Sequence, residues 1–76
     1  MTNTNKMRAR RALKALNAYR ALMGLDRTTG GAMLDESVID ILTDLRHLCN
    51  QKGLDFKGVD RCAESHFLVE VRADDD

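Results

Sequence analysis

Residues 35–52 read DESVIDILTDLRHLCNQK and form the central helix of the predicted fold. Its apolar residues recur every three or four positions, the period that brings side chains to one side of an α-helix. Asp35 and Glu36 stand at its start, where carboxylates pair with free backbone amides and suit the positive end of the helix dipole. The pattern predicts a helix whose broad apolar stripe consists of Val38, Ile39, Ile41, Leu42, Leu45, Leu48 and Cys49.

Two more helices are expected beside this one. Residues 6–23 are mostly alanine, leucine, lysine and arginine, which favour helix, and Gly24 suits the left-handed conformation that ends many helices. A second glycine stop at Gly53 is followed by Asp55, a good cap for a helix over residues 55–71. The inward side of this last helix consists of Phe56, Val59, Ala63 and Phe67.

Together these patterns predict an all-α fold, a small three-helix bundle in one domain. The second and third helices form an antiparallel hairpin as the stable unit, in which the side chains from Phe56 to Phe67 cover the apolar stripe. The first helix packs on this hairpin or on a partner chain. Outside the helices we expect a disordered N-terminus at 1–5, a flexible loop at 26–34 and a disordered acidic tail at 72–76.

Size and composition narrow the classes of function. The chain has 76 residues, of which 43% are hydrophobic and only 4% aromatic, and it has no proline, which argues against a β-sandwich or barrel. Below about 80 residues one core seldom supplies more than ~3–5 kcal/mol, so we expect a protein partner or a homodimer. No apolar run is long enough to span a bilayer, so we expect no membrane contact and a cytoplasmic location.

Neither catalysis nor a bound metal or cofactor is expected. A chain of this length can hardly enclose a catalytic pocket of roughly 300 Å³. Cys62 and His66 lie one helical turn apart, but no oxyanion donor accompanies them. Cys49 lies on the apolar stripe, where a free thiol in a reducing compartment acts as a small hydrophobe. We therefore predict that the protein is not an enzyme.

Charge is segregated along the chain although the formal net charge is zero. Residues 1–34 hold seven basic residues and one acidic residue, a net charge of +6, whereas residues 35–76 hold five basic and eleven acidic residues, a net charge of −6. A basic face on the first helix could neutralise several phosphates, or its side chains could pair with the acidic half of the chain. This candidate nucleic-acid or anion-binding surface, called the basic face below, consists of Arg8, Arg10, Arg11 and Lys14.

A line of polar residues runs along the second helix, opposite the apolar stripe. This polar ridge consists of Asp40, Asp44, His47 and Gln51. The spacing of four, three and four residues places all of them in one line that faces solvent. Such a line could hold a divalent metal with help from Cys62, His66 and Glu70, but neither a CxxC nor an HExxH motif is present. We interpret the ridge as an exposed acidic surface that binds a partner.

Several short stretches carry a resemblance to known proteins. They are ALNAYR at 15–20, DLRHL at 44–48, GLDF at 53–56 and SHFLVE at 65–70. Over roughly residues 13–70 the chain resembles a group of small proteins of bacterial prophages, plasmids and integrative elements, whose usual pattern is DLxHxx…GxDFxxxxxxAxxHYxxE. Phe67 stands where that pattern has tyrosine, so a hydroxyl is missing there. The resemblance implies a mobile-element context and no particular chemistry.

That context leads to two hypotheses of function. Small mobile-element proteins without a pocket commonly cover a host surface, and inhibitors of bacterial immunity such as anti-CRISPR proteins include charge-polarised helical chains of this size. The first hypothesis is a non-enzymatic interaction module that inhibits a host defence system, with the polar ridge against a basic groove of a host protein or nucleoprotein. The alternative is a small nucleic-acid-binding regulator that uses the basic face of the first helix.

Overall fold

The computed structural model describes residues 4–24 and 34–75, with side chains as far as residue 73. Three helices make up this part of the chain, namely α1 (Thr4–Leu22), α2 (Leu34–Lys52) and α3 (Phe56–Asp75). The described residues contain no strand. The predicted all-α architecture of three helices is therefore confirmed.

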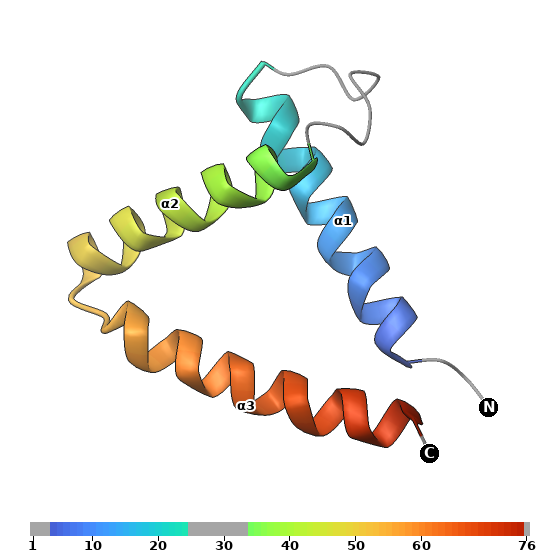
Figure 1. Cartoon of the computed structure of the whole chain (residues 1–76). Helices are drawn as coiled ribbons and strands as arrows, with labels where there is room; N and C mark the ends of the chain where they lie inside the picture. The colour runs from blue at the N-terminus through green and yellow to red at the C-terminus, as the bar shows by residue number, and fades with distance from the viewer. Residues whose placement is uncertain (1–3, 25–33, 76) are drawn as a thin grey trace.

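The helices form the three sides of a flat triangle (Figure 1). α1 crosses α2 near the start of α2, α2 and α3 meet at a corner around residues 53–55, and the end of α3 returns to the start of α1. The molecule measures 40 × 35 × 16 Å, so it is thin relative to its other two dimensions. The described helices overlap where α1 crosses α2 (Figure 1).

The corner between α2 and α3 has the glycine-dependent geometry that the sequence predicts. Gly53 has a φ of +70°, a left-handed conformation that residues with a Cβ rarely adopt. The Leu54 amide donates a 2.8 Å hydrogen bond to the Cys49 carbonyl, which closes a Schellman motif at the end of α2. Asp55 directly precedes α3, and its carbonyl accepts the Val59 amide at 3.0 Å. The predicted cap position is confirmed.

The helix ends differ from the predicted bounds in two places. α1 begins at Thr4, so the last two residues of the predicted disordered N-terminus are helical. The predicted disordered tail is wrong for residues 72–75, because α3 continues to Asp75. The reason is tertiary: Glu70 binds α1 and Val71 is half-buried, so the last turns of α3 have a neighbour to hold them. The predicted loop at 26–34 lies outside the described residues except for Leu34, which starts α2.

Very little of the chain is buried. The buried residues of the described part are Leu16, Arg20, Ser37 and Cys49. The prediction that α3 covers the apolar stripe of α2 is wrong for the single chain, since Leu45 is 40% exposed and Phe67 is 59% exposed. The two helices diverge from their shared corner, so most of each stripe has no helix of the same chain opposite it (Figure 1).

Candidate interaction surfaces

The most deeply buried side chains of the described residues lie on α1 and α2. Ser37, near the start of α2, is 2% exposed. On α1, Leu16 and Arg20 are 7% and 5% exposed and lie one helical turn apart on the same face. The sequence pattern missed Ser37 and Arg20, because polar residues are normally assigned to solvent. The one available signal was the four-residue spacing of Arg20 from the apolar Leu16.

A short hydrogen bond joins the same two helices. The Tyr19 hydroxyl of α1 donates to Asp44 Oδ2 of α2 at 2.6 Å. This bond, with partial burial and the negative charges of Asp44 and Asp40, raises the pKa of Tyr19 from 10.0 to about 12. No local signal in the sequence connects Tyr19 to a carboxylate 25 residues away.

The polar ridge is divided by this contact. His47 and Gln51 are exposed, as predicted. The prediction that the whole ridge faces solvent is wrong for Asp40, which is half-buried. Asp44 is exposed and accepts the hydrogen bond of Tyr19. Both carboxylates lie near Tyr19, because α1 crosses α2 close to the start of α2 (Figure 1).

An apolar groove of about 460 Å³ lies between α1 and α2. Three of its residues on α1 are alanines, whose short side chains leave the space open. Leu13 on one wall is 46% exposed, and Val38 and Leu42 on the other are 40% and 43% exposed. The complete lining is apolar and consists of Ala9, Ala12, Leu13, Ala15, Leu16, Leu34, Val38, Ile41 and Leu42.

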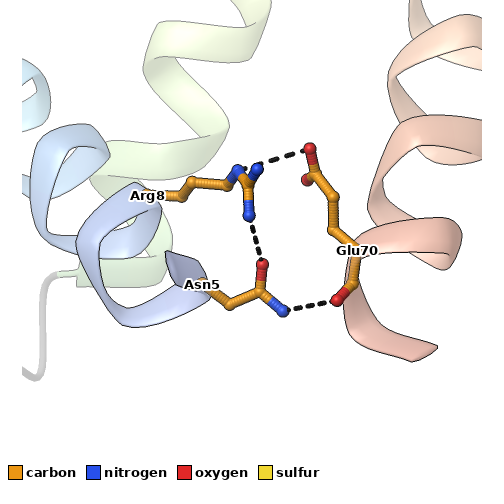
Figure 2. Close-up of polar contacts among 3 residues, drawn as sticks. All are labelled: Asn5, Arg8 and Glu70. Atoms are coloured by element: carbon orange, nitrogen blue, oxygen red, sulfur yellow. Dashed lines mark hydrogen bonds and ion pairs between the residues drawn. The ribbon is translucent and has the colours of Figure 1, made fainter. Parts of the chain in front are cut away.

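A polar clamp of Asn5, Arg8 and Glu70 closes the triangle between the start of α1 and the end of α3 (Figure 2). Arg8 Nε lies 3.3 Å from Glu70 Oε2, and Arg8 Nη1 donates to Asn5 Oδ1 at 2.8 Å. Asn5 Nδ2 in turn donates to the backbone carbonyl of Glu70 at 2.8 Å. Figure 2 shows the three side chains as one connected set between the two helices.

The clamp changes the expected composition of the basic face. Arg8 pairs with Glu70, which belongs to the acidic half of the chain. For this residue the second of the two expectations, pairing with the acidic half rather than with phosphates, applies. Arg10, Arg11 and Lys14 are exposed and, together with Met7, line an open groove of about 270 Å³ on α1. Three of the four predicted basic residues therefore lie together at one surface.

The remaining candidate residues lie around the corner of α2 and α3 and along α3. The Arg46 guanidinium lies 4.4 Å from the centre of the Phe56 ring, a cation–π contact between the two helices. Cys49 is buried and Cys62 is exposed, and neither forms a disulfide. His66 is exposed on α3. Within residues 4–24 and 34–75 no three His, Cys, Asp or Glu side chains are grouped so that they could hold a metal ion.

Two further findings bear on classification. None of the described helices combines the length and the apolar character needed to cross a membrane. Comparison with models of protein families, with curated proteins and with solved structures found no match to this chain.

Proposed function

We propose that the chain is a non-enzymatic protein-interaction module. The observation that carries this proposal is the amount of apolar side chain left uncovered: within the described residues, fifteen large apolar side chains on all three helices and the turns beside them are at least 40% exposed. Soluble monomers rarely expose contiguous apolar patches larger than a few hundred Å² unless the patch binds something. Cover by another polypeptide would remove this surface from water.

Charge supports the same proposal. Asp40 and Asp44 lie together where α1 crosses α2, and Tyr19 holds the Asp44 side chain. An ionised carboxylate has about four acceptor positions, so one bond from a phenol leaves others for donors of a partner. A partner with a basic groove would be attracted to the ridge at long range, while the apolar residues would supply most of the affinity.

The resemblance to mobile-element proteins provides the biological setting of the proposal. In that setting the module is an inhibitor that covers a surface of a host defence protein or nucleoprotein, in the manner of anti-CRISPR proteins. The ridge carboxylates stand in for the charge of a nucleic acid in the basic groove of the target.

Reversing the charge of the ridge tests this proposal. The immobilised chain is used to capture a protein from a bacterial host, and the captured protein is then purified and its binding measured directly. We expect Asp40→Lys combined with Asp44→Lys to weaken that binding by ~10-fold or more at low salt, because like charges then meet across the interface. The loss should shrink in high salt, which screens exposed charges.

Tyr19→Phe is the matched control for this experiment. It removes the hydrogen bond to Asp44 and keeps both carboxylates, so binding should stay close to that of the unmodified chain. Unchanged binding by the doubly reversed variant would exclude the ridge as the contact surface. A captured protein whose activity the chain leaves intact would exclude the inhibitor role.

The grouping of three exposed basic residues favours a second candidate, a nucleic-acid-binding regulator. Arg10, Arg11 and Lys14 share the open groove on α1 and could contact successive phosphates. This candidate predicts binding to duplex DNA or RNA with a steep dependence on salt, which is lost when the three residues are changed to glutamine. Absence of binding at ~50 mM salt would exclude it.

A further inference from the structure

The accessible surface of this chain is larger than its mass requires. The surface is 6507 Å², whereas a compact folded monomer of 8.5 kDa exposes about 4,700 Å². The radius of gyration is 14.5 Å, compared with ~11 Å for a compact domain of this length. The chain therefore exposes about 1,800 Å² more than a compact monomer would.

The described helices do not form a second layer over most of their length. Domains bury apolar faces between two packed layers of secondary structure, whereas this molecule is only 16 Å deep. The apolar groove between α1 and α2 is open, and Leu45 and Leu48 extend its α2 wall with 40% and 50% exposure. On α3, Val59 and Phe67 are 53% and 59% exposed. All three helices thus offer apolar side chains that the described part of the chain leaves uncovered.

The distribution of charge indicates what covers them. α1 carries six basic residues and no acidic residue, and of these Arg10, Arg11 and Lys14 are exposed outside the clamp. By contrast, α2 carries four acidic and two basic residues, and α3 carries five acidic and three basic residues. The acidic helices α2 and α3 of a second copy can therefore pair with the basic helix α1 of the first copy. By symmetry, α1 of the second copy can pair with α2 and α3 of the first. Because the net charge of each copy is zero, two copies meet without overall repulsion.

We propose that a second copy of this chain covers the apolar surface and forms a dimer with two-fold symmetry. In this dimer α1 of each copy packs against α2 and α3 of the other, with apolar residues at the centre and charged residues at the rim. Burial of the surplus on both copies amounts to roughly 3,600 Å², within the range of obligate homodimers. The inference rests on the proposed function, since it names one partner of the apolar surface.

Self-association of the purified chain is the first test. Sedimentation equilibrium should give twice the chain mass of 8.5 kDa, and the melting temperature should rise with protein concentration, because folding and association are linked. A chain mass of 8.5 kDa at ~100 μM, with a melting temperature that does not depend on concentration, would overturn the dimer. This test needs no variant.

A pair of variants on α2 then locates the interface. Leu45→Glu places a charge in the apolar surface and should weaken dimerisation by ~100-fold or more, since an unpaired charge would be buried. Gln51→Glu adds the same charge to the same helix on the polar ridge and should leave dimerisation unchanged. Val59→Glu repeats the test on α3. If the Leu45→Glu chain does not fold, the Val59→Glu variant still shows whether the apolar surface forms the interface. Dimers that tolerate both apolar substitutions would contradict the proposed interface.

Salt tests the arrangement of the helices. Contact between the basic helix of one copy and the acidic helices of the other predicts weaker association as ionic strength rises. Association that is unchanged or stronger in high salt would overturn this arrangement. A monomeric chain that still binds a host protein through the ridge would overturn the dimer alone, and a dimer that inhibits no host protein would overturn the inhibitor alone.

Discussion

At the scale of single residues, Tyr19 shows how an aromatic side chain can join two helices through a polar contact. Its hydroxyl bonds to Asp44 at 2.6 Å, a length typical of a strong bond to an ionised acceptor. Deprotonation would remove the donor and place a negative charge beside Asp44 and Asp40, which is why the pKa of Tyr19 is raised to about 12. The bond is therefore lost when Tyr19 deprotonates in alkaline solution.

The titration of Tyr19 can be followed directly, because it is the only tyrosine and tryptophan is absent. We expect an absorbance titration with a pKa of about 12, which returns toward 10.0 in Asp44→Asn. Since the pKa is higher in the folded chain, the stabilisation by this bond is complete below pH 10.0 and is lost as pH rises through about 12. Tyr19→Phe should lack this alkaline loss. A pKa near 10.0 in the unmodified chain would contradict the contact.

At the scale of elements, the helix ends are set by local chemistry. Gly53 ends α2 in a left-handed conformation and lets Leu54 bond back to Cys49. Gly58, in the first turn of α3, also has a local reason: a Cβ there would lie 2.9 Å from Asp55 Oδ2. Glycine weakens a helix by up to about 1 kcal/mol relative to alanine, and here it leaves room for the side chain at the cap position.

Substitution of Gly53 tests the corner between α2 and α3. Gly53→Ala forces a Cβ into the left-handed region and should lower the free energy of unfolding by about 1–2 kcal/mol, measured by urea denaturation. Gly53→Asn is the matched comparison, and its loss should be smaller because asparagine tolerates this conformation better. Equal stability of Gly53→Ala and the unmodified chain would show that the turn adopts another geometry.

At the scale of the whole molecule, the triangle is closed by polar contacts rather than by a core. The clamp joins the start of α1 to the end of α3, two segments about as far apart in sequence as the chain allows. The side chains of Arg8 and Glu70 are 42% and 34% exposed, so solvent screens their ion pair. The single chain is therefore held open and flat by its corners, and its apolar surface remains available to a partner.

A double-mutant cycle measures the contribution of the clamp. Arg8→Ala and Glu70→Ala should each destabilise the chain slightly, with a coupling energy of about 0.2–1 kcal/mol, the range of exposed ion pairs. The coupling should fall in high salt. Lys14→Ala combined with Glu70→Ala is the control pair, since Lys14 lines the basic groove rather than the clamp. No coupling between Arg8 and Glu70 would indicate that the triangle closes differently in solution.

The candidate sites followed from the sequence only where residues on one helix form one surface. Arg10, Arg11 and Lys14 do meet at one groove, because a single helix brings them together. Arg8 belongs to the same helix, but its partner Glu70 is 62 residues away, so no local pattern in the sequence indicates this ion pair. The same holds for Tyr19 and Asp44, whose contact depends on the angle at which α1 crosses α2.

Local signals in the sequence specify three helices and the end of α2, because helix period, capping carboxylates and glycine stops act within a few residues. The open triangle, in which Leu45 and Phe67 remain exposed, depends instead on how the helices pack against one another. An apolar stripe specifies that a side of a helix avoids water, but it does not specify whether a helix of the same chain or another polypeptide will cover it.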